Sequence, residues 1–348
     1  MNTVLKWTKE NLFYSPASAV MTLVTAAVSV WVSVLFLDWA LFSANVAGSA
    51  AADCTGEGAC WVFIKERFSQ FIYGFYPEGQ RWRVNLTFVA ISVSVFGALS
   101  GKIGAAKWWL LFLCLILPPF VWTLLEGGTA GLEPVESSQW GGLLVTIIVS
   151  FVGICFSLPF GIILALGRRS EMPVIRLFSI GFIEFWRGVP LITVLFMASV
   201  MIPIFLPPSL QFDKLLRALL GVFFFSSAYM AEVVRGGLQA IPKGQYEAAE
   251  ALGLNYVQKM SYIVVPQALK LVIPGIVNNF IGLFKDTTLV AIIGMYDLLG
   301  IVQAANNDPD WLGFAVEGYV FAAAVFWVFC WGMSKYSRSL EAKLKTTH

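Results

Sequence analysis

Long apolar runs recur along this 348-residue chain and limit what it can fold into. The first covers about residues 17–42, and at 1.5 Å of rise per residue a helix of that length can cross the hydrocarbon core of a bilayer. Hydrophobic residues make up 58% of the sequence and charged residues 13%, which lies outside the composition of soluble proteins. Because a backbone in lipid must satisfy its own hydrogen bonds, the runs predict helices. We expect an all-α fold, a polytopic membrane helical bundle of about eight transmembrane helices.

The expected helices are apolar stretches bounded by polar residues. They cover approximately residues 17–42, 85–99, 108–125, 141–166, 190–205, 215–234, 267–299 and 313–333. The first stretch also resembles a secretory signal peptide, with residues 44–47 as its cleavage site. It is longer than the roughly 7–15 apolar residues of a signal peptide, so we expect an uncleaved membrane helix.

Lysine and arginine gather in the loops that a cytoplasmic N-terminus would place inside the cell. These residues are Lys102, Lys107, Arg168, Arg169, Arg176, Arg235, Lys243, Lys259 and a C-terminal cluster of Lys335, Arg338, Lys343 and Lys345. The loops at 126–139 and 291–312 carry neither residue type, whereas the loop at 43–84 carries four basic residues and departs from the pattern. The positive-inside rule therefore predicts a multi-pass protein whose N- and C-termini are both cytoplasmic.

Histidine, a residue of many catalytic and metal sites, occurs only once in this chain. The single histidine is the C-terminal His348. Residues 97–102 resemble a phosphate-binding loop only superficially, because three residues instead of four separate the glycines and no Ser or Thr follows Lys102. No basic run is interleaved with aromatic residues. We expect no catalytic residue, no metal site, no cofactor bound to this chain and no nucleic-acid partner.

The loop at 43–84 holds two features with alternative interpretations. Cys54 and Cys60 form a disulfide if the loop lies outside the cytoplasm, and are otherwise two free thiols. Residues 61–76 are rich in aromatic side chains, and form either an amphipathic helix at the membrane interface or a partly ordered loop.

A polar segment, residues 242–266, separates two apolar runs and predicts two short helices joined by a bend. Pro242 suits the first turn of the first helix, and Gly253 can adopt the left-handed conformation that ends it. Asn255 and Gln258 have the spacing of a capping box that opens the second helix. Such a segment could dock in a cleft of another protein, with the small Ala248 and Ala249 permitting close approach. An ordinary cytoplasmic loop would fit the same pattern.

The spacing within this segment resembles the signature loop of bacterial ATP-binding-cassette importer permeases. The matching residues are Glu247, Ala248, Ala249, Gly253, Ile263 and Pro266, with Val265 in place of the usual Leu. Three further stretches, residues 185–191, 228–237 and 285–289, are similar to the polar amino-acid branch of these permeases. The N-terminal third, with three added helices, resembles the long permease subunit of general L-amino-acid importers.

The resemblance implies a type I importer fold with a core of five helices in the bacterial inner membrane. It implies an N-terminal extension at 1–139, with three transmembrane helices and a periplasmic loop, and a transmembrane domain at 140–348 whose coupling helix lies near 242–265. The implied partners are ATPase subunits that bind ATP and Mg²⁺, a second homologous permease subunit, a periplasmic amino-acid-binding protein and the lipid bilayer. This chain would do no covalent chemistry and would convert ATP hydrolysis in its partner into alternating access.

Charged residues within apolar stretches are the candidates for substrate or gate contacts, because each is unfavourable in lipid unless paired or hydrated. Lys285 and Asp286 interrupt the seventh run, and Thr287 and Thr288 follow them. A break in the helix there would free backbone groups, and these side chains supply the groups that bind an amino-acid zwitterion. Helix–helix pairing is the alternative. Glu184 and Arg187 are further candidates, and Glu232 with Arg235 predicts an i,i+3 ion pair.

A secondary transporter or channel driven by an ion gradient is the alternative function. It would account for the helices and the charges in apolar stretches. It would not account for the segment at 242–266.

Overall fold

The computed structural model describes residues 2–99, 108–109, 112–129, 131–207 and 212–345. Lys102 and Lys107, which helped to orient the chain, lie outside the described residues. The chain groups into two compact units, unit 1 formed by Met1–Phe68 and Asn306–Gly318, and unit 2 formed by Ser69–Ala305 and Tyr319–His348. These units are defined by contacts in space, so they do not test the boundary at residue 140 that was predicted from family resemblance.

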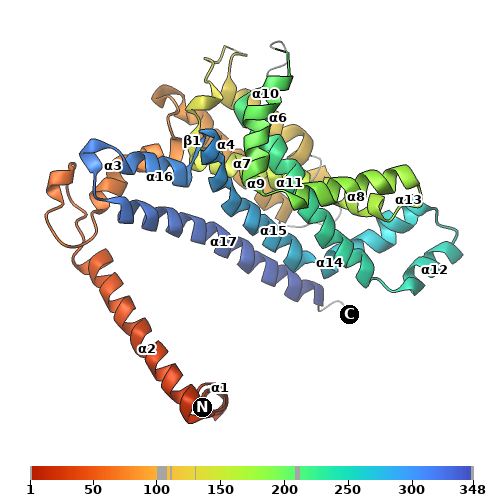
Figure 1. Cartoon of the computed structure of the whole chain (residues 1–348), viewed down its shortest axis with the longest axis horizontal. Coiled ribbons are helices and arrows are strands. Elements are labelled where there is room, and N and C mark those ends of the chain that lie inside the picture. The colour runs from red at the N-terminus through yellow and green to blue at the C-terminus, as the bar shows by residue number, and fades with distance from the viewer. Residues whose placement is uncertain (1, 100–107, 110–111, 130, 208–211, 346–348) are drawn as a thin grey trace. The chain divides into compact units, whose positions relative to one another are not determined.

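Unit 1 begins with two helices, α1 (Asn2–Asn11) and α2 (Pro16–Leu37), and a π-helical turn at Asp38–Phe42 (Figure 1). Ser15 opens α2 with a capping box, in which the Ser18 N–H donates to the Ser15 hydroxyl at 3.2 Å. No residue of α2 is buried within the described chain, which leaves its apolar surface available to lipid.

The polar loop after α2 is held by covalent and polar contacts within unit 1. A disulfide joins Cys54 to Cys60, with 5.7 Å between the Cα atoms, and the Cys60 N–H donates to Glu317 Oε1 at 2.9 Å. Arg67, on α3 (Trp61–Tyr73), forms an ion pair with Asp308. The short 3₁₀ helices Ala51–Asp53 and Pro309–Trp311 complete the unit.

A helix, α3, is present where one of the two interpretations of residues 61–76 placed it, but its apolar side chains have different surroundings from those predicted. Val62, Phe63 and Phe71 on α3 are fully buried. Within unit 1 the Phe63 ring lies 5.4 Å from that of Trp311. These apolar side chains of α3 therefore pack against protein, so a helix lying with them in the membrane interface, one of the two interpretations left open, was wrong.

Two long helices, α7 (Leu143–Arg168) and α11 (Lys214–Ala240), pack against each other in unit 2. Gly161 permits their close approach, because a Cβ at this position would lie 2.8 Å from Met230 Cβ. Around this pair lie α8 (Pro173–Gly188), α9 (Leu191–Phe196), a π-helical turn at Met197–Met201, α14 (Val265–Leu271) and α15 (Ile273–Asp286). The short α10 (Ile202–Phe205) continues from the π-helical turn. The chain continues through the 3₁₀ helix Thr287–Ile293, α16 (Leu298–Asn306) and α17 (Ala315–Lys345).

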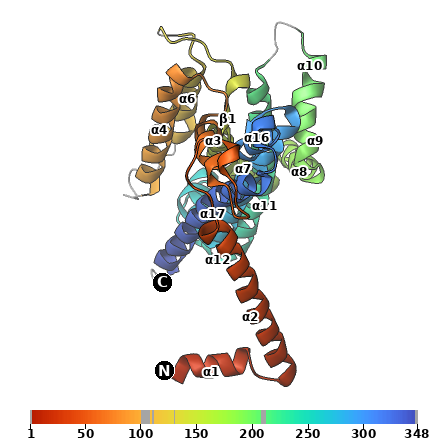
Figure 2. The ribbon, with the colours of Figure 1, turned by 90° about the vertical axis from the view of Figure 1, so that its left-hand side faces the viewer.

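The N-terminal extension adds α4 (Arg81–Leu99), preceded by a 3₁₀ turn at Glu78–Gln80, and α6 (Leu117–Glu126), preceded by a π-helical turn at Phe112–Ile116. Figure 2 shows α4 and α6 side by side. Their buried apolar residues join those of α7 and α11 in one core. Beside them, a 3₁₀ turn at Ser137–Gln139 leads to β1 (Gly141–Gly142), which pairs in parallel with β2 (Tyr296–Asp297).

The described residues contain six helices long and apolar enough to cross a membrane, together with one bent pair and one shorter apolar helix. The six are Pro16–Phe42, Glu78–Leu99, Leu143–Arg168, Lys214–Ala240, Ile273–Ile293 and Ala315–Leu344, and the shorter helix is Phe112–Glu126. The bent pair joins α8 to Leu191–Phe205 at an angle of 102°. The bend falls at Val189–Pro190, since the residue before a proline is disfavoured in the α conformation.

Candidate functional site

The polar segment at 242–266 folds into the two short helices that its sequence predicts, at one end of unit 2 (Figure 1). Helix α12 (Lys243–Ala251) ends before Gly253, which has a φ of +72°. Helix α13 (Tyr256–Gln258) opens with the expected capping box: the Asn255 N–H donates to Gln258 Oε1 at 3.0 Å, and the Gln258 N–H donates to Asn255 Oδ1 at 2.9 Å. A π-helical turn at Lys259–Val264 then leads into α14.

The residues that match the family pattern fall into outward-facing and inward-facing groups. Glu247, Ala248, Gly253 and Pro266 are exposed, and Ile263 is half-buried. Ala249 is fully buried, so the expectation that both alanines permit close approach of a partner was wrong for this one. Successive residues of a helix point about 100° apart, so Ala248 can face outward while Ala249 packs inward.

Four large apolar side chains stand exposed on the same segment, and sequence reasoning did not single them out. Leu252 is 76% exposed, Tyr256 55%, Val257 70% and Tyr262 74%. Large apolar side chains exposed on an otherwise polar segment are a feature found at protein contact surfaces. The signal in the sequence was the presence of these large apolar residues within a stretch otherwise rich in polar ones.

The base of α12 is anchored to the core by Arg169, which follows α7. Arg169 Nη1 donates to the Leu238 carbonyl at 3.0 Å and to the Tyr246 hydroxyl at 2.9 Å. Its guanidinium also lies 5.4 Å from the centre of the Tyr246 ring, a cation–π distance. At the far end of the segment, Gln267 Nε2 donates to Gln245 Oε1 at 3.1 Å. The segment is thus fixed to α7, α11 and α14.

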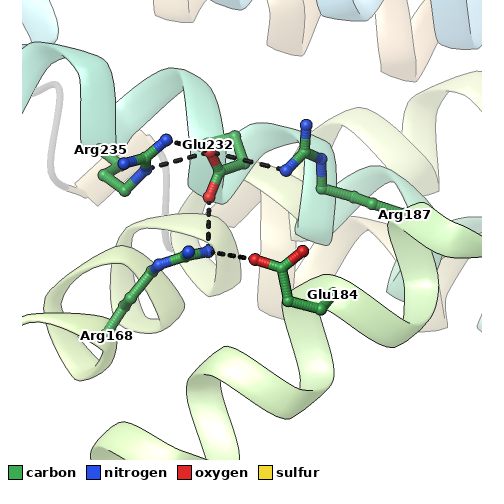
Figure 3. A network of polar contacts seen from close by, with 5 residues as sticks. All are labelled: Arg168, Glu184, Arg187, Glu232 and Arg235. Carbon is green, nitrogen blue, oxygen red and sulfur yellow. Dashed lines mark hydrogen bonds and ion pairs between the residues drawn. The ribbon is translucent and has the colours of Figure 1, made fainter.

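The residue before Arg169 belongs to a five-residue ion network that joins α7, α8 and α11 (Figure 3). Arg168 Nη1 lies 3.0 Å from Glu184 Oε1 and 2.9 Å from Glu232 Oε1. Glu232 Oε2 also lies 2.6 Å from Arg235 Nη2 and 3.6 Å from Arg187 Nη1. The i,i+3 pair predicted for Glu232 and Arg235 is therefore present, as one part of a larger cluster.

This network accounts for the two charged residues of α8 that were candidates for substrate or gate contacts. Glu184 and Arg187 each contact a charged residue of a neighbouring helix, Arg168 and Glu232 respectively. Arg187 also lies over the Tyr229 ring, 5.6 Å from its centre. In this structure their contacts hold α8 against α7 and α11, and their position beside Arg169 puts them at the end of the bundle that carries α12.

The stretch Lys285 to Thr288 does not interrupt its helix, so the predicted break was wrong. Residues Ile273–Ile293 form one span, in which α15 tightens to a 3₁₀ helix at Thr287. The Thr287 hydroxyl donates to the Phe284 carbonyl at 2.9 Å, and the Thr288 hydroxyl donates to the Lys285 carbonyl at 3.0 Å. These bonds satisfy backbone carbonyls that a break would have freed.

The four polar residues of this stretch have different surroundings. Lys285 and Thr288 line a cavity of about 350 Å³ in unit 2, together with Tyr319 and Phe326. Thr287 is only 1% exposed, and neither it nor the half-buried Asp286 lines that cavity. Among the residues that the structure describes, no group of three or more His, Cys, Asp or Glu is placed to hold a metal ion.

Comparison with known proteins identifies the family. The family model "Binding-protein-dependent transport system inner membrane component" matches residues 157–345. The inner membrane amino-acid ABC transporter permease protein YhdY of Escherichia coli K12 is 54% identical over 340 residues, which are 98% of this chain and 93% of YhdY. BztC of Rhodobacter capsulatus, a glutamate/glutamine/aspartate/asparagine transport system permease protein, is 39% identical over 99% of this chain and 94% of its own.

A solved structure, described as an amino acid ABC transporter with histidines, matches with a TM-score of 0.51 at 29% identity. It covers 58% of this chain and 92% of its own. The two relatives span the N-terminal extension as well as the region of the family model. This chain belongs to the family of inner membrane components of binding-protein-dependent transport systems.

Proposed function

We propose that this chain is the long permease subunit of an ATP-driven importer of polar L-amino acids, and that its segment at 242–266 docks in the ATPase. The chain is a multi-pass inner membrane protein, and ATP hydrolysis in its family belongs to a separate subunit. Relatives named as amino-acid permeases support the substrate class. The observation that carries the docking role is the group of exposed apolar side chains, Leu252, Tyr256, Val257 and Tyr262, on a segment anchored to three core helices.

Docking at this segment provides a path for mechanical coupling. A displacement of α12 acts on Arg169 through the Tyr246 hydroxyl and on α14 through Gln245. Arg168, the preceding residue and the last of α7, holds Glu184 of α8 and Glu232 of α11. Short polar contacts of this kind resist separation, so α7, α8 and α11 would move with α12 as one body. Rocking of that body would open the pore alternately to each side of the membrane.

The partners follow from the same proposal. ATPase and substrate-binding subunits belong to importers of this family. We further propose a second, homologous permease subunit, ATP and Mg²⁺ bound by the ATPases, and cytoplasmic N- and C-termini. The excess of Lys and Arg at the end of the bundle that carries α12 supports this orientation.

Lys285 and Thr288 are the residues we propose for contact with substrate, since they line the cavity with Tyr319. An ammonium and a hydroxyl can both donate to an amino-acid carboxylate. Asp286 and Thr287 do not line this cavity, so we assign neither a contact with substrate there; the Thr287 hydroxyl supports the turn by donating to the Phe284 carbonyl.

Reconstitution of the whole importer tests the docking role. Val257→Ser and Tyr262→Ser should weaken co-purification of the ATPase and lower ATP-driven uptake into proteoliposomes, because they remove exposed apolar contact area. Val174→Ser is the matched control, since Val174 is 79% exposed on α8 and lies outside the segment. Normal ATPase binding in both test variants would contradict docking at this surface. Uptake that continues without ATP would favour transport driven by an ion gradient.

A further inference from the structure

A polar cavity of about 420 Å³ lies at the base of α12 in unit 2. Arg169, Lys243, Tyr246 and Glu247 line it, together with residues from the end of α11. Its volume lies in the range of small-ligand sites, about 300–1,000 Å³. Lys243, Tyr246 and Glu247 belong to α12, whereas Arg169 follows α7. A ligand in this cavity would therefore contact both the core of unit 2 and the docking segment.

The three charged side chains of this cavity have no charged partner within the described part of the chain. Arg169 donates only to neutral acceptors, a carbonyl of α11 and a hydroxyl of α12, and both bonds come from Nη1. Lys243 and Glu247 form neither an ion pair nor a side-chain hydrogen bond with a described residue. Glu250, one turn further along α12, does form an ion pair, with Lys259. The cavity thus presents two cations and one carboxylate that remain available to a ligand.

The charges of the lining indicate the chemical class of the ligand. Glu247 would repel an inorganic anion, and Arg169 and Lys243 would repel a metal cation. The Nε and Nη2 groups of Arg169 form no hydrogen bond within the described chain, and a guanidinium binds carboxylates well. Lys243 is also the first residue of α12, and the N-terminus of a helix favours negative charge. The complementary ligand has two carboxylates and one ammonium, which are the charged groups of an acidic amino acid.

We propose that this cavity binds a free acidic amino acid such as glutamate from the cytoplasm, with its carboxylates at Arg169 and Lys243 and its ammonium at Glu247. Glu247 is exposed on the docking segment, so a ligand held there competes with the ATPase for this residue. Binding of the ATPase and binding of the ligand then weaken each other by the same factor. Acidic amino acid that accumulates in the cytoplasm thereby slows import. This inference rests on the proposed function, which places α12 in the cytoplasm and against the ATPase.

The first test uses the unaltered importer in proteoliposomes and three compounds. ATP and L-glutamate, L-glutamine or glutarate are sealed inside, and the binding protein with a radiolabelled amino acid that the importer carries is added outside. Glutamine lacks the second carboxylate and glutarate lacks the ammonium. We expect glutamate to halve the initial rate of uptake at a concentration about fivefold lower than either, the effect of losing one partly exposed charged contact. Equal inhibition by the three compounds, or none by glutamate, would overturn the proposal.

Two variants with matched controls locate the site. Lys243→Ala should abolish the preference for glutamate over glutamine, and Glu247→Gln should abolish the preference for glutamate over glutarate. Lys270→Ala and Glu171→Gln, at exposed positions outside the cavity, should keep both preferences. Each variant is compared with its own uptake in the absence of an internal compound, so a partial loss of ATPase docking does not enter the result. Unchanged preferences in both test variants would refute this location.

Direct binding separates failure of this inference from failure of the docking role. Binding of radiolabelled L-glutamate to the purified complex, without the binding protein, is measured by equilibrium dialysis, and the retained ATPase is counted in the same sample. Lys243→Ala should lower glutamate binding about fivefold. Unchanged glutamate binding in Lys243→Ala, with the ATPase released by Val257→Ser and Tyr262→Ser, would refute this site and leave the docking role intact. Lower glutamate binding in Lys243→Ala, with the ATPase retained by the other two variants, would refute the docking role and leave the binding site intact.

Discussion

Replacing Glu232 by glutamine should loosen the joint between α7, α8 and α11. Glu232 is 14% exposed in its side chain and accepts from Arg168 at 2.9 Å and from Arg235 at 2.6 Å. Hydrogen bonds to charged groups contribute about 1.5–3 kcal/mol. The pair with Arg235 is within one helix and partly exposed, so it adds only about 0.3–0.5 kcal/mol. Glutamine keeps one acceptor oxygen but loses the charge, and we expect a loss of about 2 kcal/mol in unfolding free energy.

The loss is measured as the thermal midpoint of the purified importer complex at one fixed scan rate. For a chain of 348 residues, a loss of about 2 kcal/mol corresponds to a drop in Tm on the order of 3 °C. Glu78→Gln is the control, because the Glu78–Arg81 pair has the same i,i+3 spacing but an 85% exposed carboxylate, and it should shift the midpoint by less than about 1 °C. A cycle with Arg168→Gln should reveal a coupling of about 1 kcal/mol between Arg168 and Glu232. Additive effects of the two changes, or a midpoint equal to that of Glu78→Gln, would refute a joint centred on Glu232.

Three further predictions concern the docking segment, a buried carboxyl and the disulfide. Gly253→Val should destabilise the bend by about 1–2 kcal/mol and lower co-purification of the ATPase, because φ is +72° there. Gly253→Asn is the control, since asparagine tolerates that conformation. Unchanged co-purification with Gly253→Val would contradict this prediction. Burial raises the pKa of Asp297 from 3.8 to about 6. Between about pH 4 and 6 the folded chain keeps this proton while the unfolded chain has lost it, so the free energy of unfolding should fall as pH rises through this range. Asp297→Asn should remove on the order of 2–3 kcal/mol of that pH dependence, measured as the difference between the two Tm–pH curves, and parallel curves would argue against it. In the denatured, unreduced protein, maleimide should label Cys114, Cys155 and Cys330 but not Cys54 or Cys60; five labels without reductant would exclude the disulfide.

Local features of the fold could be predicted from the sequence because neighbours in the chain determine them. The apolar runs gave the long helices, and the capping box of Asn255 with Gln258 and the positive φ of Gly253 are present where the spacing placed them. The helix end at Val189 also has a local cause, the proline that follows it, although the strongly bent pair of helices on either side was not predicted.

Features that depend on distant parts of the chain could not be predicted in this way. Arg168 and Glu232 are 64 residues apart, and nothing in either neighbourhood indicates that they meet. The burial of Ala249 depends on which face of α12 meets the core. The polar run from Lys285 to Thr288 suggested a break, but two threonine hydroxyls bond to carbonyls three residues earlier and keep the chain helical.

Arg168, the last residue of α7, and Arg169, which follows it, make the rotation of this helix end about its axis important. Arg168 reaches the carboxylates of α8 and α11, whereas Arg169 reaches Tyr246 of α12, so consecutive side chains serve two different neighbours. Adding or deleting a single residue in the last turn would rotate this end by about 100°. A deletion would turn Arg169 toward the carboxylates, and an addition would turn Arg168 toward α12. In either case the two sets of contacts could not form together, so α7 tolerates exchange of its side chains far better than any change in its length.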